Sequence, residues 1–485
     1  MTPPNFQNHY IGLPDRFYSK VEPAKVPTPE LIRINDSLAC DLGMDPKWLT
    51  SEAGIAMLAG NALPEGAEPI AQAYAGHQFG GWVPQLGDGR AILLGEVEHR
   101  DGKSRDVQLK GAGRTPYSRG GDGKSPIGPV LREYIVSEAM AALGVPTTRA
   151  LAAVSSGEPV YRDEALPGAV FTRVASSHVR VGTFQFFYAR EDTDALRVLA
   201  DFVIDRHYPA AGDAVNRYEE LLKSVIRRQA ALIAKWMHLG FIHGVMNTDN
   251  MTVSGETIDF GPCAFMDDFH PETVFSSIDR QGRYAWINQP VAGSWNLARF
   301  AETLLPLLAE ERGEAISIAE RSIQEFEGVF GDAYFNGFAE KLGLSGGDEK
   351  ARPFVEKTLG MMAEDGLDFT RFFTSLTRFA KRENSDKALS ELPVTEGWQD
   401  WQEEWGSLRR RDAAALEEME MSNPVIIARN HRVEEAIQAA MKGDLTVFHR
   451  LVEALEFPFD PRDEFSEFES APSDDEKVTA TFCGT

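Results

Sequence analysis

The part of the chain that decides the fold reads His243-Gly-Val-Met-Asn-Thr-Asp-Asn250 and continues as Met251-Thr-Val-Ser-Gly-Glu-Thr-Ile-Asp-Phe-Gly261. The continuation holds two β-prone triplets, Met251–Val253 and Glu256–Ile258. Between them stands Ser-Gly, a pair typical of a two-residue hairpin turn. This spacing predicts a β-hairpin within residues 243–262.

In the register set by that turn, Asn250 lies opposite Asp259. Opposed hairpin residues place their Cβ atoms roughly 4.5–5.5 Å apart on one face. An amide oxygen and a carboxylate at this spacing suit Mg²⁺, which takes one or two protein oxygens and completes its shell with phosphates and water. The hairpin therefore predicts a metal site facing a nucleotide, with an Asx-capped turn as the alternative.

Composition excludes several classes of protein. The 485 residues are 43% hydrophobic, which allows a large core and two or three domains. Lys and Arg total 49 against 74 Asp and Glu, and this net charge of −25 argues against nucleic-acid or anionic-membrane partners. We find no targeting peptide or membrane-spanning run, and Cys40, Cys263 and Cys483 form no disulfide framework. We expect a cytoplasmic protein.

An Asn, a short hairpin and then Asp-Phe-Gly is also how protein kinases hold their metal ions. Aligned with the kinase loop His-Arg-Asp-Leu-x-x-x-Asn, His243 and Asn250 match, but Val245 takes the place of the catalytic Asp. A valine cannot accept a proton, and the nearest carboxylate is Asp249. The motif predicts either an inactive kinase or a rearranged chemistry.

A glycine-rich stretch, Ala75–Arg90, precedes two expected strands, Ala91–Glu98 and Arg105–Lys110. Lys110 thus ends a strand in the role of the kinase lysine that pairs with phosphates, although a surface lysine is the alternative. The next stretch, residues 111–126, has the composition of a flexible, basic, phosphate-facing loop. The Asp-Gly pair at 122–123 belongs to that loop or forms a plain β-turn.

Pro129 then opens an expected helix to Leu143, the position of the αC helix in a kinase. In a kinase, a glutamate of this helix pairs with the lysine. Glu133 and Glu138 both qualify, and helical periodicity does not choose between them. Arg173 and Arg180 follow, either to grip phosphates or to form surface salt bridges.

The remaining chain is mainly helical. We expect an α+β fold like a two-lobed protein kinase, with a small β-rich lobe containing one αC-like helix and a large helical lobe. Its expected parts are a wrapping segment at 1–60, the β-rich lobe at 61–180, the helical lobe at 181–455 and a mobile acidic tail at 456–485. Expected helices are Tyr218–Leu239, Asn296–Ala309, Ala315–Val329, Ala351–Met362, Thr370–Arg382 and Val433–Leu455.

Together these motifs resemble the selenoprotein O family, a kinase-like group described as protein adenylyltransferases. The resemblance covers nearly the whole chain. Its motifs are Tyr74-Ala-Gly-His-Gln-Phe-Gly80, Gln85-Leu-Gly-Asp-Gly-Arg90, Gln108-Leu-Lys-Gly-Ala-Gly-Arg-Thr-Pro-Tyr-Ser-Arg119, the stretch from His243 to Asn250, Ile258-Asp-Phe-Gly-Pro262, Asn423-Pro424 and Arg429-Asn430.

The resemblance implies that ATP binds flipped relative to a kinase, and that AMP passes to a Ser, Thr or Tyr hydroxyl of a protein substrate, this protein itself included. It implies Mg²⁺ as cofactor, with Mn²⁺ as the alternative. Asp249 takes the proton-acceptor role, Asn250 and Asp259 bind the metal, and Glu133 pairs with Lys110. The nucleotide contacts implied are Gly87, Gly89, Arg90, Lys110, Asp122, Gly123, Arg173, Arg180 and Asp259.

Two other functions stay open beside AMP transfer. One is an atypical kinase that uses Asp249 as its base. The other is a nucleotide-binding scaffold, ranked last because Asn250 and Asp259 are both present. The resemblance also departs at one point: animal members carry selenocysteine near the C-terminus, where this chain has Cys483 without an adjacent partner cysteine. A redox role for Cys483 with Cys263 and two inert cysteines are both compatible with the sequence.

Overall fold

The computed structural model describes residues 3–381 and 392–482, and it has the expected mixed α+β composition. Its centre is an eight-stranded antiparallel sheet in the order β1-β3-β6-β7-β10-β9-β2, with β8 paired to β10. The strands are β1 (Tyr18–Lys20), β2 (Glu30–Ile34), β3 (Ile70–Gln72), β6 (Ala91–Glu98), β7 (Ser104–Lys110), β8 (Ser125–Pro126), β9 (Arg149–Tyr161) and β10 (Ala165–Ala175).

The first 60 residues are an integral part of this sheet rather than a separate wrapping segment. β1 and β2 are its two outer strands. Three short helices, α1 (Asp36–Asp41), α2 (Pro46–Leu49) and α3 (Glu52–Leu58), contribute to a hydrophobic cluster with one face of the sheet. Strands of three and five residues are too short to show a clear alternation of apolar and polar residues, so the sequence did not reveal them.

The central strands divide their side chains between two faces, as alternation along a strand requires. Val107 and Leu109 of β7 join the cluster shared with α1–α3. Gln108 and Lys110 alternate with them, and Arg173 of β10 is the register partner of Gln108. The second face of the sheet therefore carries polar side chains at its centre.

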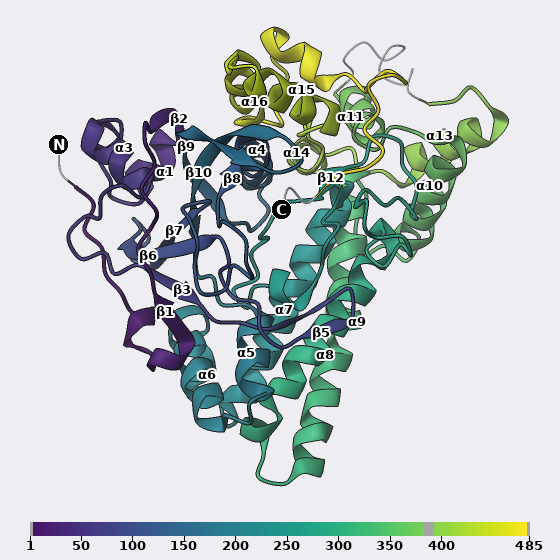
Figure 1. The fold of residues 1–485 in the computed structure, drawn as a ribbon. Helices are drawn as coiled ribbons and strands as arrows, with labels where there is room; N and C mark the ends of the chain where they lie inside the picture. The colour runs from purple at the N-terminus through teal and green to yellow at the C-terminus, as the bar shows by residue number, and fades with distance from the viewer. Residues whose placement is uncertain (1–2, 382–391, 483–485) are drawn as a thin grey trace.

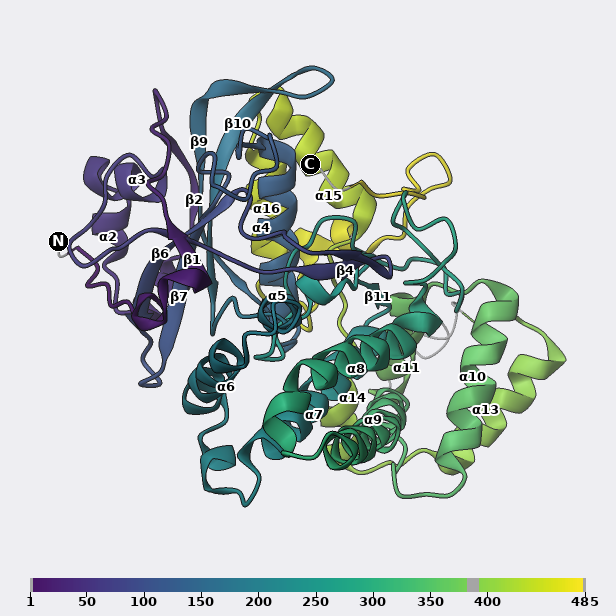
Figure 2. The ribbon, with the colours of Figure 1, turned by 60° about the horizontal axis from the view of Figure 1, so that its bottom comes forward.

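This second face is covered by α4 (Ile127–Ala142), which packs on β9 and β10. α15 (Asn430–Met441) and α16 (Thr446–Leu455) pack on α4 in turn, as Figure 2 shows. The sequence predicted a single helix over 433–455. The structure breaks it in two, because Gly443 adopts a left-handed conformation (φ +89°) that ends α15.

The other helices form a second region beside the sheet, in which α7, α8 and α9 pack together (Figure 2). α7 matches its expected bounds within one residue, and the end of the helix expected at 370–382 lies outside the described residues. No helix in the described ranges is both long and apolar enough to cross a membrane. The helices are α5 (Val181–Tyr188), α6 (Thr193–His207), α7 (Arg217–His238), α8 (Gln289–Leu308), α9 (Arg312–Lys341), α10 (Ala351–Asp365), α11 (Phe369–Ala380), α13 (Glu396–Leu408) and α14 (Ala413–Ser422).

The hairpin predicted between Met251 and Ile258 is wrong. Thr252 forms an antiparallel bridge with Arg180, and Thr257 forms a parallel bridge with Thr147. The turn between them closes through the Thr252 hydroxyl, which accepts from the Glu256 amide and donates to the Glu256 carbonyl. Each triplet thus contributes one bridge residue, and each of these residues pairs with a distant segment. Two-stranded pairs occur instead at β4–β5 (Gly76–Gln78, Gly81–Val83) and β11–β12 (Phe241–Ile242, Ala264–Phe265).

The acidic segment from 456, expected to be mobile, packs against the body as far as residue 482. It contains a 3-10 helix, η7 (Asp463–Glu469), whose Phe465 and Phe468 are buried. Nearer the end, the Thr481 hydroxyl donates to the Pro262 carbonyl at 2.6 Å. Two buried phenylalanines within an acidic run thus anchor it to the body. Cys483 lies outside the described residues.

Candidate active site

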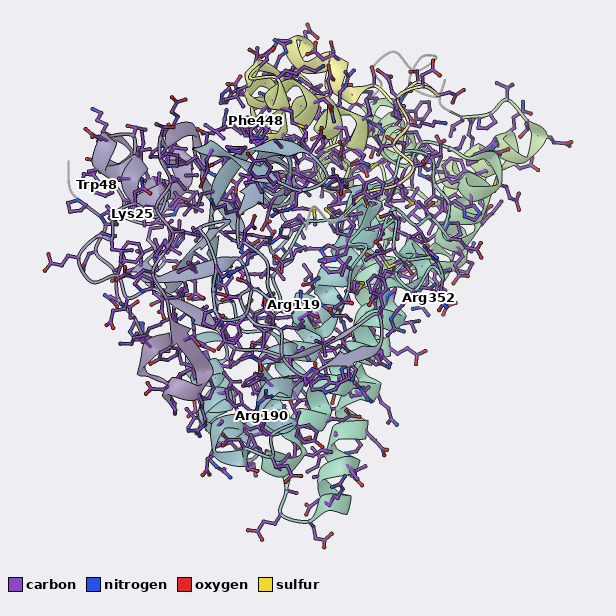
Figure 3. The ribbon with its side chains drawn as sticks, viewed as in Figure 1. Lys25, Trp48, Arg119, Arg190, Arg352 and Phe448 are labelled. Carbon is purple, nitrogen blue, oxygen red and sulfur yellow. The ribbon has the colours of Figure 1, made fainter. Side chains whose placement is uncertain are left out.

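A cleft of about 850 Å³ lies between the polar face of the sheet, α4 and the loop that follows β11. Figure 3 labels Arg119, which comes from the loop at 111–126 and lines the cleft, near the middle of the molecule. The cleft collects all the residues that the sequence analysis assigned to nucleotide, metal or catalysis. These are Gly87, Gly89, Arg90, Lys110, Asp122, Gly123, Glu133, Arg173, Arg180, Asp249, Asn250 and Asp259.

Lys110 and Glu133 form the ion pair at the junction of sheet and α4, with 2.5 Å between Nζ and Oε2. Arg173 reaches the other oxygen of Glu133 at 3.1 Å, and its guanidinium donates twice to the Gln108 side-chain oxygen. Glu138 points to a different partner, because both of its oxygens accept from Arg149. The structure thus places Glu133, and not Glu138, beside the lysine.

We expect Glu133→Ala to weaken ATP binding by on the order of tenfold, because it removes one of the two carboxylates that Lys110 and Arg173 share. Glu138→Ala is the matched control on the same helix, since its carboxylate serves only structural partners outside the cleft. Titration calorimetry with ATP measures both, and thermal melts report any loss of fold. An equal loss of affinity in the two variants would contradict the assigned pairing.

Asp259 is the point where the cations of the cleft converge. Its carboxylate lies 2.9 Å from Lys110, 2.7 Å from Arg173 and 3.1 Å from Arg180. Burial alone would raise the pKa of Asp259, but these three charges outweigh burial and hold the pKa well below its usual range. The carboxylate is therefore ionised at any physiological pH.

Backbone strain marks the same site. Four non-glycine residues of the described chain have positive φ, and three of them, Phe79, Arg119 and Asp259, line the cleft. Such conformations cost about 1–3 kcal/mol each and persist where surrounding structure enforces them. The positive φ of Asp259, +64°, directs its carboxylate toward the three cations.

Arg180 is held at the cleft by the pairing that replaces the predicted hairpin. Its segment runs antiparallel to Thr252, and its guanidinium donates to the Asp249 carbonyl at 2.7 Å. The guanidinium also lies over the ring of Tyr74, 4.6 Å from the centroid. Arg180 is 2% exposed, and its contacts with the Tyr74 ring, the Asp249 carbonyl and the Asp259 carboxylate hold it inside the cleft.

The donors near Asp259 fit a hard divalent cation. The Asn250 side-chain nitrogen donates to the Val245 carbonyl at 3.0 Å, so its oxygen is the atom left for a metal. Together with the Asp259 carboxylate, this gives two protein oxygens of the kind that Mg²⁺ takes when phosphates complete its shell. Val245 lies in the same cleft, at the position where a kinase has its catalytic Asp.

Asp249 has the environment of a general base. It is 7% exposed, and burial raises the pKa of its carboxyl to about 6, although the Gln78 hydrogen bond opposes the shift. Gln78 donates to Oδ2 at 3.2 Å, whereas Oδ1 has no hydrogen-bond partner in the described structure. A buried carboxylate oxygen without a partner, lining a cleft, is free to accept a proton from a bound hydroxyl.

The Tyr74–Gly80 motif supports this base from the sheet side. The His77 amide donates to the Thr248 hydroxyl at 2.7 Å, and the Phe79 amide donates to the Asn247 side chain at 2.9 Å. Gly76 permits the contact, because a Cβ there would lie 2.7 Å from Asp249 Oδ1. The motif therefore positions residues 247–249 through hydrogen bonds of its backbone amides, which residue types alone do not reveal.

Gly87 and Gly89 belong to a tight turn at the cleft wall. A Cβ on Gly87 would lie 2.4 Å from the ring of Tyr117, so packing inside the protein already requires this glycine. The Ser118 hydroxyl donates to the Gly89 carbonyl, and this hydrogen bond connects the turn to the loop at 111–126. Arg90 follows directly and lines the cleft.

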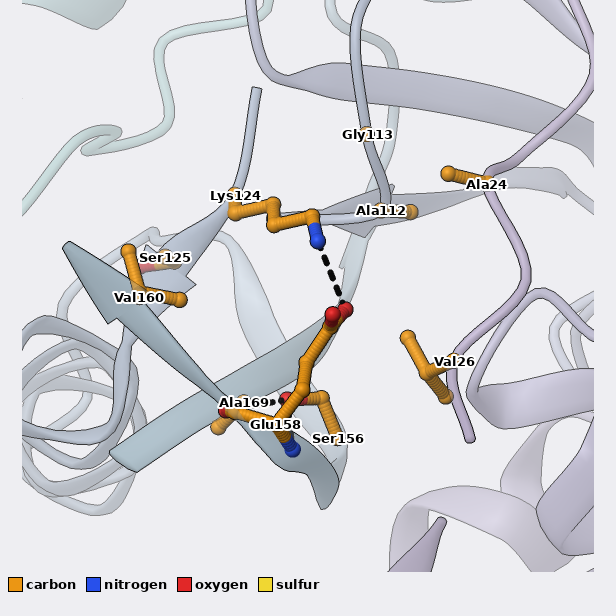
Figure 4. Close-up of a pocket in the computed structure, with 11 residues that line it drawn as sticks. Ala24, Val26, Ala112, Gly113, Lys124, Ser125, Ser156, Glu158, Val160 and Ala169 are labelled. Atoms are coloured by element: carbon orange, nitrogen blue, oxygen red, sulfur yellow. Dashed lines mark hydrogen bonds and ion pairs between the residues drawn. The ribbon is translucent and has the colours of Figure 1, made fainter. Parts of the chain in front are cut away.

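The loop at 111–126 is less free and less basic than its composition suggested. Lys124 forms an ion pair of 2.8 Å with Glu158, shown in Figure 4. Asp122 pairs with Arg162 at the cleft rim, and the left-handed Gly123 lies close to the Gly113 backbone. The second half of the loop is thus fastened to the β9–β10 hairpin.

The sequence analysis missed several side chains that shape the site. Gln78 contacts the base, Tyr74 underlies Arg180, and Gln108 accepts from Arg173. All three stand inside the quoted motifs. Gln108 also alternates with apolar neighbours in its strand, so the sequence did contain a signal that its side chain lies on the same face of the sheet as Lys110.

Comparison with known proteins identifies the family to which the chain belongs. The sequence model of a family described as "Protein adenylyltransferase SelO" matches residues 2–456. The chain belongs to this family. Relatives called "Protein nucleotidyltransferase YdiU" from Rhizobium johnstonii and Rhizobium meliloti are 54% and 52% identical to it. The first alignment covers 99% of this chain and 97% of the relative, and the second covers 100% of both. The resemblance to the selenoprotein O family is therefore confirmed over the whole chain.

Proposed function

We propose that this member of the SelO family transfers AMP from ATP to a Ser, Thr or Tyr hydroxyl of a protein, in a Mg²⁺-dependent reaction on a kinase-like two-lobed fold. The observation that carries the proposal is the convergence of Lys110, Arg173 and Arg180 at Asp259 in the cleft. Arg173 and Arg180 are 1% and 2% exposed, and cations that deep suit the β- and γ-phosphates rather than an adenine.

With the triphosphate end inside, the α-phosphate is the electrophile nearest Asp249. The free Oδ1 of Asp249 accepts the proton of the acceptor hydroxyl as the hydroxyl oxygen bonds to the α-phosphorus. The bond from that phosphorus to the β-bridging oxygen breaks, and pyrophosphate leaves with its charge held by the arginines. Asn250 and Asp259 would hold Mg²⁺, which would supply further charge neutralisation for the phosphates.

This orientation gives a reason for Val245. A kinase places its catalytic Asp there to meet a hydroxyl that attacks the γ-phosphate. If the γ-phosphate lies inside the cleft, no acceptor reaches it from that position, and a carboxylate there has no task. The base is instead supplied by Asp249, one residue before the metal ligand Asn250.

ATP labelled separately at the α- and γ-phosphates separates this function from the alternatives. The protein is incubated with Mg²⁺ and each label, with itself and a cell extract as acceptors. We expect α-label on protein and free pyrophosphate. Protein-bound γ-label would instead show an atypical kinase that uses Asp249, and neither label would show a nucleotide-binding scaffold.

A further inference from the structure

Arg132 connects the segment after Asp259 to the C-terminal helices. It stands on α4, next to Glu133, and is 6% exposed. Its Nε donates to the Gly261 carbonyl at 2.9 Å, and its Nη2 donates to the Cys263 carbonyl at 2.8 Å. One guanidinium thus holds two carbonyls that lie two and four residues beyond Asp259.

Side chains bind the backbone carbonyls of residues 261–263, and Phe260 just before them is buried in the core. The Pro262 carbonyl, between the two that Arg132 takes, accepts from Thr481. Regular strand pairing resumes only at β12, and Asp259 itself has a positive φ. Lys110, Arg173 and Arg180 hold the Asp259 carboxylate directly, and the side chains that bind the carbonyls just after it fix the backbone that carries it.

α15 fixes the guanidinium from the other side. Asn430 Oδ1 accepts from Nη2 at 2.8 Å, and Glu434 Oε1 lies 3.0 Å from Nη1. These two acceptors are four residues apart, so they share one face of the helix. Arg429, which precedes α15, is itself paired with Asp267 and Asp368. The Arg429-Asn430 motif thus helps to hold Arg132, which in turn contacts the segment after Asp259.

We propose that Arg132 is a positioning residue for the metal-binding loop, which couples α15 to the placement of Asp259. The proposal rests on the proposed function only in taking Mg²⁺·ATP as the ligand of that loop. A lysine keeps the charge of Arg132, but its single nitrogen cannot span two carbonyls, an amide and a carboxylate in one plane. Residues that orient a metal ligand typically change metal affinity or activity by about 10–100-fold when replaced.

The test compares Arg132→Lys with Arg149→Lys. Arg149 is the matched control, because it also pairs with a glutamate, Glu138 of α4, and its described side-chain hydrogen bonds do not reach the loop after Asp259. We expect Arg132→Lys to raise the Mg²⁺ concentration needed for half-maximal ATP binding by about 10–100-fold. The fall in kcat should be larger than the fall in the affinity for ATP measured without metal. Amide hydrogen exchange over residues 259–266 should become faster. Arg149→Lys should change neither.

Two further variants keep the test decisive if Arg132→Lys does not fold. Asn430→Ala and Glu434→Gln retain Arg132 and each weaken one of its supports, so each should give a smaller shift in the same direction. Unchanged Mg²⁺ dependence and exchange in these variants, or equal effects in Arg132→Lys and Arg149→Lys, would overturn the proposal. Binding and exchange are measured without transfer, so a wild-type protein that transfers no AMP would count against the function alone.

Discussion

Asp259→Ala is expected to reduce AMP transfer by on the order of 10³-fold while the protein stays folded. The carboxylate is the charged member of the proposed metal pair and the shared partner of Lys110, Arg173 and Arg180. Its removal takes away the charge that would hold Mg²⁺ and leaves Lys110, Arg173 and Arg180 without the carboxylate that all three contact. Asn250→Ala should have a smaller effect, because an amide brings no net charge to the cation.

The measurement is the rate of α-label incorporation at saturating ATP, across a Mg²⁺ titration. Asp101→Asn is a suitable control, because this aspartate lies in the turn between β6 and β7 and pairs with Arg105 away from the cleft. Circular dichroism and thermal melts test the fold of each variant. Wild-type activity that survives complete chelation of divalent ions would contradict the metal site.

Asp249→Asn is expected to lower kcat by about 10²–10⁴-fold and to leave ATP affinity nearly unchanged. Asparagine keeps the shape of the side chain and its hydrogen bond with Gln78, but it cannot accept a proton. In the wild type, burial raises the pKa of Asp249 to about 6, so the base is protonated and inactive below that pH. We therefore expect kcat/KM to fall as the pH drops through about 6.

The pH profile and the variant check each other. The residual activity of Asp249→Asn should lack the fall near pH 6 that the wild type shows. A wild-type profile that is flat between pH 5 and 8, or an Asp249→Asn enzyme with wild-type kcat, would remove Asp249 from the role of base.

Local patterns in the sequence predicted those elements whose own residues show a clear alternation or helical periodicity. The strands at 91–98 and 105–110 and the helices α4 and α7 were recognisable because alternation, turn residues and helical periodicity agree there. The predicted hairpin failed for the opposite reason. Thr252 and Thr257 satisfy their backbones with Arg180 and Thr147, more than 70 residues away, and no local pattern records such partners.

The candidate site shows the same division. Helical periodicity did not decide whether Glu133 or Glu138 pairs with Lys110. The structure shows that Glu138 forms an ion pair with Arg149, whereas Glu133 forms one with Lys110. The acidic C-terminal segment was expected to be mobile from its charge. Its buried Phe465 and Phe468 were too few to register as a pattern, although they anchor it.

The orientation of the bound nucleotide tests the central claim most directly. A crystal structure of the complex with Mg²⁺ and a non-hydrolysable α,β-methylene analogue of ATP would locate every phosphate. We expect the β- and γ-phosphates to contact Lys110, Arg173 and Arg180, with the α-phosphorus facing Asp249. A γ-phosphate at the cleft mouth beside Asp249, with adenine buried among the arginines, would contradict the claim and indicate a kinase.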